Sequence, residues 1–342
     1  MSPSPAAPWL LCWQGLLATE QTSRLRKLLP QIAGGMLCAL LLVLPMATRT
    51  GLGLLIAACG LLWLVWGLAT APVQRPLGAI NGWLLVYLAI ALVATGLSPV
   101  PVAAAKGLLK LLSYFGVYAL MRRLLEGAPQ WWNRLLAALL LGQLITAVIG
   151  LRQLYAPIED LALWADPNSV ADGTRRIYST LGNPNLLAGY LVPILPLAVI
   201  GLLRWQGLWP KLLALSSLGC GLAAALLSYS RGGWIGLLLA LGSLGLLLLL
   251  RQSRRLGPLW GKLLPPLVIT AVVVALVLAA IKVEPLRIRL TSMLAGRGDS
   301  SNNFRINVWL AALEMIQARP WIGIGPGNSA FNLVYPLYQQ PG

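Results

Sequence analysis

Residues 231–251 read RGGWIGLLLALGSLGLLLLLR, and this stretch decides the fold class. Arg231 and Arg251 enclose residues 232–250, which contain no charged side chain. A helix needs about 20 apolar residues to cross the hydrocarbon core of a bilayer. The stretch therefore predicts a membrane-spanning helix with an arginine at each end.

The composition of the whole chain agrees with a membrane protein. Of its 342 residues, 58% are hydrophobic and only 10% are charged, whereas a soluble domain is about a quarter charged. This excludes an ordinary cytosolic enzyme, and the long apolar runs exclude a disordered chain. The net charge is +17, but the cations recur in small groups between apolar runs. A nucleic-acid-binding protein would gather them on one face or tail, so no nucleic-acid partner is predicted.

The same pattern recurs along the chain, which contains nine apolar runs of membrane-spanning length. None alternates apolar and polar residues with the period of two that is typical of a strand. We therefore expect an all-α, polytopic integral membrane protein. The nine predicted spans are residues 31–47, 51–70, 79–97, 103–121, 134–152, 186–203, 212–228, 232–250 and 263–281.

The positions of the cations orient these spans, because cytoplasmic loops of membrane proteins carry an excess of Lys and Arg. With the N-terminus in the cytoplasm, thirteen of the 26 cations fall in short cytoplasmic segments. They are Arg24, Arg26, Lys27, Arg75, Arg122, Arg123, Arg134, Arg204, Lys211, Arg251, Arg254, Arg255 and Lys262. We therefore expect a cytoplasmic N-terminus.

This topology divides the chain into three parts. Residues 1–30 form a cytoplasmic N-terminal segment, residues 31–281 form the transmembrane helical domain, and residues 282–342 form a large outer loop that looks cut short. Seven of the nine acidic residues fall in the loop 153–185 and in the outer loop. These polar external parts are where we expect the function to lie.

The residue types exclude several chemistries. The chain has no histidine, which excludes a Ser-His-Asp triad, a zinc site built on histidine and an imidazole base. Its four cysteines show no CxxC spacing, and we expect them to be packed as small hydrophobes. No metal site or cofactor is predicted.

Two cationic positions lie within or between predicted spans. Lys106 and Lys110 are four residues apart and share one helix face. Lys110 either snorkels to the outer headgroups or faces a polar cavity, because an intramembrane cation is costly in lipid. Ser228-Tyr-Ser-Arg-Gly-Gly-Trp234 separates two spans by a few residues and places Arg231 at the outer surface.

In that joint, Ser230 precedes the arginine, and Gly232 and Gly233 allow a backbone or a ligand to approach closely. The alternative is a tight interhelical turn whose arginine meets headgroup phosphates. A second polar stretch, Thr180-Leu-Gly-Asn-Pro-Asn-Leu-Leu-Ala188, precedes the sixth span.

In this second stretch we expect Asn185 to cap the helix and Gly182 with Pro184 to shape the turn, next to Asn183. Arg176 lies just upstream. A helix start with no further role would explain the same residues.

The outer loop contains an amphipathic helix pattern over residues 302–316, which stops at Pro320. Arg305 is expected on its first turn, and a surface helix whose arginine meets headgroups is the alternative. The run Gly323-Ile-Gly-Pro-Gly327 follows. It is not a dinucleotide-binding fingerprint, since no strand precedes it and no helix clearly opens from it.

These cationic residues share one predicted side of the membrane. Under the inferred topology Arg176, Arg231, Arg305 and Lys110 all lie at or above the same leaflet. An arginine fork donates two parallel hydrogen bonds to planar anions such as carboxylate, carbonate-like or phosphate groups. We infer an outward-facing, cation-lined cavity that binds an anionic group.

The same segments resemble the O-antigen ligase superfamily of bacterial membrane proteins, over about residues 30–335. The matching stretches are Gly182-Asn-Pro-Asn185, Ser230-Arg-Gly-Gly-Trp234, and Arg305, Trp309, Pro320 and Gly323–Gly327 in the outer loop. Phe331-Asn-Leu-Val-Tyr-Pro-Leu-Tyr-Gln-Gln340 is most similar to the branch of cyanobacterial inorganic-carbon transporters.

The resemblance implies a GT-C-like, all-helical fold of about ten to twelve spans in the bacterial plasma (inner) membrane, with its site at the periplasmic face. Ligases of the superfamily transfer a glycan from an undecaprenyl diphosphate carrier without metal or nucleotide. Their outward arginines hold the diphosphate. Arg231 and Arg305 match these arginines, and Arg176 matches more loosely. The histidine that serves as their base has no counterpart in this chain.

Two classes of function follow from the resemblance. The transporter branch implies a protein that binds bicarbonate in an outward-facing, arginine-lined cavity. The alternative is glycosyl transfer from an undecaprenyl diphosphate-linked glycan to a lipid or glycan acceptor, and the residues leave open whether the chain is an enzyme. In both readings the partners are membrane lipid and an anionic substrate.

Overall fold

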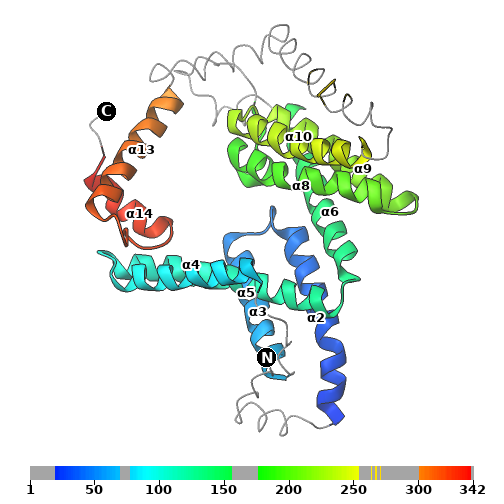
Figure 1. The fold of residues 1–342 in the computed structure, drawn as a ribbon, viewed down its shortest axis with the longest axis horizontal. Helices are drawn as coiled ribbons and strands as arrows, with labels where there is room; N and C mark the ends of the chain where they lie inside the picture. The colour runs from blue at the N-terminus through cyan, green and yellow to red at the C-terminus, as the bar shows by residue number, and fades with distance from the viewer. Residues whose placement is uncertain are drawn as a thin grey trace. The chain divides into compact units, whose positions relative to one another are not determined.

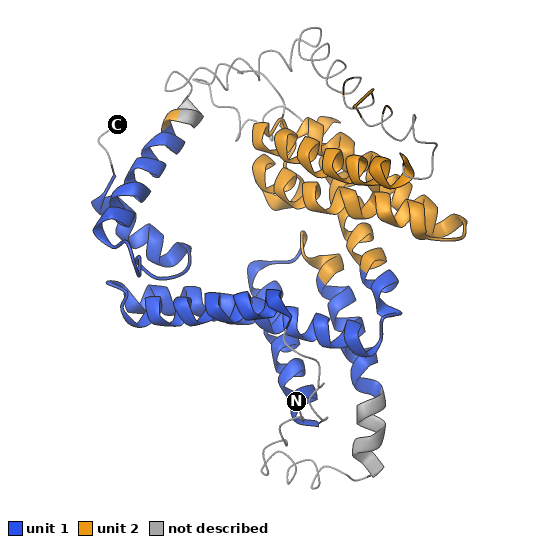
Figure 2. Ribbon diagram, in the orientation of Figure 1, with its two compact units in different colours: residues 1–40, 47–135, 304–342 blue, residues 41–46, 136–303 orange. Residues whose placement is uncertain are grey.

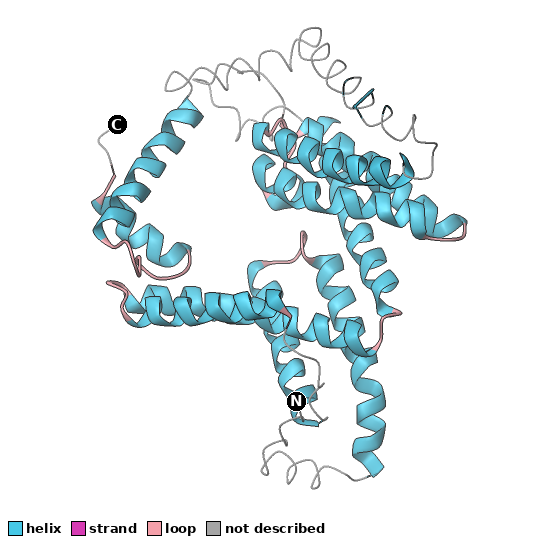
Figure 3. Cartoon of the chain, in the orientation of Figure 1, coloured by secondary structure: helices cyan, strands magenta, loops and turns pink. Residues whose placement is uncertain are grey.

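The computed structural model describes residues 20–69, 78–155, 176–253 and 300–339, together with the isolated residues 263, 266, 267 and 270. Within these ranges the secondary structure is helical and contains no strand, as Figures 1 and 3 show. The expected all-α membrane fold is confirmed. The helices are α2 (Glu20–Val43), α3 (Arg49–Ala69), α4 (Ala79–Gly96), α5 (Pro101–Gly127), α6 (Trp131–Arg152), α8 (Pro184–Arg204), α9 (Leu208–Leu227), α10 (Arg231–Ser253), α13 (Ser300–Ala318) and α14 (Asn328–Val334).

Among the described residues, seven helices are long and apolar enough to cross a membrane. They are α3, α4, α5, α6 with the 3-10 turn that follows it, α8, α9 and α10, and each coincides with a predicted span. The predicted span 31–47 lies on α2, whose apolar part Leu28–Val43 is shorter. Most of the predicted span 263–281 lies outside the described residues, as do residues 156–175 and 282–299.

The described helices belong to two compact units, which Figure 2 colours separately. Unit 1 comprises residues 1–40, 47–135 and 304–342, and unit 2 comprises residues 41–46 and 136–303. Each unit has one central helix. In unit 1, α3, α4 and α14 pack against α5, and in unit 2, α9 and α10 pack against α8.

In unit 1, α5 crosses α3 through two glycines. A Cβ added to Gly116 would lie 2.9 Å from the Cα of Gly60, so the two backbones touch. Small residues at such crossings let membrane helices approach closely and gain van der Waals contact, since lipid provides no hydrophobic driving force between them. Near the end of α3, the Arg123 guanidinium lies 5.2 Å from the Trp66 ring centroid.

In unit 2, α8 supplies most of the apolar core. Its Leu187, Leu191 and Leu195 are fully buried and pack against Ala224 of α9 and Leu237 of α10. This side-by-side arrangement of α8, α9 and α10 brings the starts of α8 and α10 close together, because both helices begin next to the end of α9.

One buried polar pair fastens α6 to α9 in unit 2. The Gln143 Nε2 donates to the Ser217 carbonyl at 3.0 Å, and the Ser217 hydroxyl donates to the Gln143 Oε1. Both residues have no exposed surface. Interhelical hydrogen bonds of this kind contribute about 0.6–2 kcal/mol in membranes. The pair therefore fixes the rotation of α9 and, with it, the position of the α9–α10 joint.

Candidate functional site

The start of α8 is built on an asparagine and a proline. Asn183 has extended backbone angles (φ −148°, ψ 126°), and its side chain accepts a hydrogen bond from the Asn185 backbone N–H, at 2.8 Å between Oδ1 and N. Pro184 occupies the first helical position, where its missing N–H is not needed. The expected cap at Asn185 is therefore wrong: Asn183 caps the helix, because a capping side chain bonds the N–H two or three residues ahead.

Because Asn183 caps the helix, the Asn185 side chain is available to bond residues of two other segments. Its Oδ1 accepts from the Arg176 Nη2 at 3.2 Å and from the Ser230 hydroxyl at 2.9 Å. The same arginine donates from Nε to the Ser228 carbonyl at 3.1 Å. One guanidinium thus bridges the start of α8 and the α9–α10 joint, as its two-sided fork allows.

Ser230 caps the next helix, α10. Its hydroxyl oxygen accepts from the Gly233 N–H at 3.3 Å, and its carbonyl accepts from the Trp234 N–H at 2.9 Å. Because this hydroxyl also donates to Asn185, a single buried serine couples the first turns of α8 and α10. We call Arg176, Asn183, Asn185, Ser228 and Ser230 the junction.

The two glycines of the joint differ in their surroundings. A Cβ on Gly233 would lie 2.6 Å from the Ala188 Cβ and 3.1 Å from the Ser230 Cβ, so α8 and α10 touch at this glycine. A Cβ on Gly232 would meet no heavy atom of the described residues within 4 Å. Of these two glycines, Gly233 is therefore the one at which two helices approach closely, whereas Gly232 faces open space.

Two strained residues flank the junction. Ser179 (φ 54°) and Tyr229 (φ 48°) are the non-glycine residues with positive φ in the described part of the chain. Such a conformation costs on the order of 1–3 kcal/mol and persists where surrounding contacts impose it. Here the Gln153 Oε1 accepts from the N–H groups of Tyr178 and Ser179, each at 2.9 Å, and the Ser179 hydroxyl donates to the Thr146 carbonyl at 2.6 Å.

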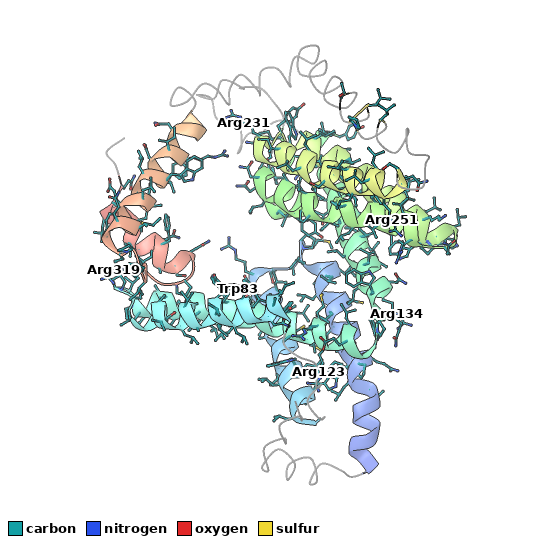
Figure 4. The ribbon with its side chains drawn as sticks, in the orientation of Figure 1. Trp83, Arg123, Arg134, Arg231, Arg251 and Arg319 are labelled. Atoms are coloured by element: carbon teal, nitrogen blue, oxygen red, sulfur yellow. The ribbon has the colours of Figure 1, made fainter. Side chains whose placement is uncertain are left out.

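The described part of the junction combines two helix starts with two arginines. A helix start carries partial positive charge and is stabilised by a nearby negative group. The first turns of α8 and α10 contain no acidic residue. Instead, Arg176 lies beside the first and Arg231, half-buried, begins the second, where Figure 4 labels it. Two helix starts and two guanidinium groups thus concentrate positive charge in one part of unit 2.

Lys110 lies in unit 1, on the exposed surface of α5, with Lys106 one turn before it. The structure adds a contact that the sequence did not suggest. The run Gly323–Gly327 docks on the same stretch of α5, where Gly327 touches the backbone of Gly107 and Gly325 touches Ala104. Lys110 follows Gly107 by three residues, so it lies on the flank of this dock.

Hydrogen bonds from the turn between α4 and α5 hold the same dock. The Ser98 hydroxyl donates to the Ile324 carbonyl at 2.6 Å, and Arg319 donates from Nη1 to the Leu97 carbonyl at 3.3 Å. Gly323, Gly325 and Gly327 all have positive φ, between 67° and 97°, which explains the glycines of the run. The dock comprises Ser98, Ala104, Gly107 and residues 319–327.

Arg305 lies on α13 and is exposed. The helix predicted for residues 302–316 is confirmed and extends from Ser300 to Ala318. Because it begins earlier than expected, Arg305 is on its second turn and not on its first. The expectation that no helix opens from the glycine run is also wrong, since α14 begins directly after Gly327.

Several of these residues escaped the sequence analysis. Ser228, Ser179, Gln153 and Ser98 are ordinary polar residues at helix ends, and their roles depend on partners that are distant in sequence. The positive φ of Tyr229 could have been suspected from the sequence, because this residue lies in a joint of very few residues between two spans. In the described ranges no group of acidic residues and cysteines could hold a metal ion, and Cys38, Cys59 and Cys220 are free thiols.

The fold and the site together define a multi-pass helical membrane protein with a cationic junction between two helix starts. Residues 212–342 match a family model described as O-Antigen ligase. This match includes the joint with Arg231 and the helices α13 and α14, and with the apolar helices it supports a membrane protein that is O-antigen ligase-like over these residues. No curated protein and no solved structure gives a significant match to the chain.

Proposed function

We propose that this protein binds an anionic substrate in an outward-facing, arginine-lined cavity, of which the junction in unit 2 is the best-defined part. The observation that carries the proposal is that Arg176 and Arg231 lie at two neighbouring helix starts of unit 2. The N–H groups of a helix start carry partial positive charge and favour a nearby anion. An arginine fork beside such a start can add two parallel hydrogen bonds to carboxylate-like or phosphate oxygens.

Contacts inside each unit support the sidedness that the proposal needs. In unit 2 the Thr180 hydroxyl donates to the Pro45 carbonyl at 2.6 Å, and Arg176 bonds Ser228. In unit 1 the Ser98 hydroxyl bonds the Ile324 carbonyl. Every one of these pairs joins segments that the cation pattern assigns to the outer side. A wrong count of spans between them would have put the partners on opposite sides.

We propose bicarbonate as the substrate, in line with the resemblance to the inorganic-carbon transporter branch. Bicarbonate is a planar anion of the size that one arginine fork can hold. Lys110 and Arg305, on unit 1, are proposed from the sequence to serve the same substrate. The proposed location is the bacterial plasma membrane with a cytoplasmic N-terminus.

The alternative is glycosyl transfer, which the family match at residues 212–342 favours. In that reaction an acceptor hydroxyl attacks the sugar carbon, the bond to the carrier diphosphate breaks, and the arginines neutralise the departing diphosphate. The acceptor proton must pass to a base, whose help is worth roughly 10²–10⁴-fold. Because the chain has no histidine, this base would be an outer carboxylate.

One reconstitution experiment separates the two activities. The full chain in proteoliposomes is given labelled bicarbonate in one arm, and an undecaprenyl diphosphate-linked glycan with an acceptor in the other. Uptake without glycan transfer supports transport, and transfer without uptake supports the ligase reaction. Absence of both activities, in protein that is folded and inserted, would contradict both readings.

The arginine itself is tested by Arg231→Lys, which keeps the charge and removes the fork. We expect Arg231→Lys to insert normally and to lose at least tenfold of whichever activity the reconstitution detects. The control is Arg204→Lys, at the end of α8 that is far from the junction, and it should have no effect on that activity. Full activity of Arg231→Lys would mean that the residue only anchors a turn. Cysteine at position 231 should react with a membrane-impermeant thiol reagent from outside, and reaction from the cytoplasmic side alone would refute the sidedness.

A further inference from the structure

The outer hairpin, residues 300–339, belongs to unit 1 from Phe304 onward. It exposes large apolar side chains although neither of its helices is a candidate membrane span. Trp321, in the turn between α13 and α14, is 92% exposed, and Trp309 on α13 is 65% exposed. Leu313, Ile316, Leu333 and Leu337 are exposed as well. Several exposed large apolar side chains in one segment are typical of a contact with a membrane or a protein.

These residues have a defined arrangement on α13. Trp309, Leu313 and Ile316 follow one another at spacings of four and three, so they share one helix face. Ala311 and Met315 lie on another face and are buried within unit 1. The helix thus packs with one face and presents a second apolar face outward, where it is free to contact lipid.

The dock fixes the depth of the hairpin relative to a span. α5 has 27 residues and is about 40 Å long at 1.5 Å per residue. The hydrocarbon core is about 30 Å thick, so a centred α5 extends about 5 Å beyond it at each end. Gly107 is the seventh residue of the helix, about 9 Å from its start. An α5 centred in the bilayer would therefore place the Gly325–Gly327 turn, which touches Gly107, near the edge of the hydrocarbon.

At that depth, side chains that point away from α5 meet lipid. Tryptophan is the residue best suited to the boundary, because its ring is apolar and its N–H bonds headgroups and water. Arg319 directly follows the last residue of α13 and is exposed. It lies next to the end of α4, as its hydrogen bond to the Leu97 carbonyl and Figure 4 show. Its guanidinium supplies a cation for lipid phosphate groups. The cation, the depth of the dock and the exposed tryptophans all favour membrane lipid as the partner of this surface.

We infer that the α13–α14 hairpin is a lipid-contacting surface that lies in the headgroup region of the leaflet reached by the turn between α4 and α5, with Trp309 and Trp321 at the hydrocarbon boundary. The glycine dock on α5 holds it there. The hairpin is then a peripheral layer of the membrane domain and not a water-exposed flap. This inference is independent of the identity of the substrate.

The test uses the full chain with its four cysteines replaced by alanine, reconstituted in vesicles of phosphatidylethanolamine, phosphatidylglycerol and phosphatidylcholine brominated at carbons 6 and 7. Trp321→Cys carries an NBD label, and Asn332→Cys, an exposed polar position on α14, is the matched control. We expect lipid bromine to quench the label at 321 at least twofold more strongly than the label at 332. Aqueous iodide should show the opposite order.

Two results would overturn the inference. If iodide quenches both labels equally, the hairpin stands in water. If neither quencher reaches position 321, a second copy or another protein covers it. Trp309→Cys provides a second labelled position with the same expected outcome, in case the change at 321 disturbs the turn. No anion or activity enters the readout, so failure here is distinct from failure of the proposed anion site.

Discussion

The junction of unit 2 and the dock of unit 1 join distant segments by opposite means. In the junction, Arg176, Asn185 and Ser230 meet through hydrogen bonds between side chains and to one carbonyl. In the dock, glycine backbones touch, and the hydrogen bonds beside that contact run from Ser98 and Arg319 to backbone carbonyls. The difference teaches that an arginine or asparagine next to a helix start can suggest a contact from the sequence, whereas a contact between glycine backbones cannot.

The two regions should also respond differently to substitution. A hydrogen-bonded network loses one partner at a time, and each loss is worth about 1–3 kcal/mol. A contact between two backbones does not lose stability in such small steps, because any side chain added there must displace a rigid neighbour. The dock is therefore expected to be the more brittle region.

The largest effect is expected for Gly107→Leu, which fills the dock. Even a Cβ at this position would overlap the Pro326 carbonyl, and overpacking of this kind is worth about 3 kcal/mol. We expect the outer hairpin to detach and to become sensitive to limited proteolysis between residues 300 and 339. Gly82→Leu on α4, where nothing lies within 4 Å in the described part of the chain, is the control and should keep the wild-type cleavage pattern. An uncut hairpin in Gly107→Leu would show that the contact with α5 is dispensable.

The next effect is expected for Arg176→Lys in the junction. An ammonium cannot reach the Ser228 carbonyl and the Asn185 amide together, so one charged hydrogen bond is lost, worth about 2 kcal/mol. Denaturation of the purified protein by a graded increase of sodium dodecyl sulfate measures this loss. Arg152→Lys, exposed at the end of α6, should leave stability unchanged. Equal stability of the two variants would mean that the bridge contributes little.

The two adjacent glycines of the joint give a sharper comparison within the junction itself. Gly233→Ala forces a Cβ against Ala188 and should destabilise the protein by about 1–2 kcal/mol. Gly232→Ala enters open space and should be neutral or stabilising by up to about 1 kcal/mol, because alanine favours a helix. The same detergent titration compares them. Indistinguishable variants would contradict the close packing of α8 on α10.

The smallest effect is expected for Ser230→Ala, which removes the cap of α10 and its bond to Asn185. A lost cap is worth about 1 kcal/mol. The matched control is Ser243→Ala, in the same helix, whose exposed hydroxyl bonds only the Leu239 carbonyl one turn back. If both serines have the same effect on stability, Ser230 does not couple the two helix starts.

Residue types predicted much of the junction but not its wiring. Arg176 was expected near a site because of its inferred side of the membrane, and Asn183, Asn185 and Ser230 because their stretches resemble those of the superfamily. The structure brings these residues together, and their role toward an anion stays a prediction. The cap was assigned to the wrong asparagine, since either side chain could satisfy a helix start. Their three-dimensional partners decided that Asn183 caps and that Asn185 bridges.

The dock was beyond the reach of the sequence analysis. A run of three glycines between a helix and Asn328 is typical of any turn, and nothing in Gly107 distinguishes it from the other glycines of the predicted spans. Helix α14, which opens directly after the run, was missed for the same reason. Its seven residues are stabilised by packing on α5, with Ala330 buried against Ala103 and Ala104, and not by a pattern of their own.

The sequence by itself determined the fold class, the positions of the described spans and the kinds of residue at the ends of the helices. It could do so because transfer of apolar residues into lipid is a local free energy that depends on composition alone. Only the tertiary structure decided which asparagine caps α8, which glycine must remain a glycine, and where the outer hairpin rests. Those outcomes depend on atoms that are distant in sequence and a few ångströms apart in space, and no local property of the chain specifies such pairs.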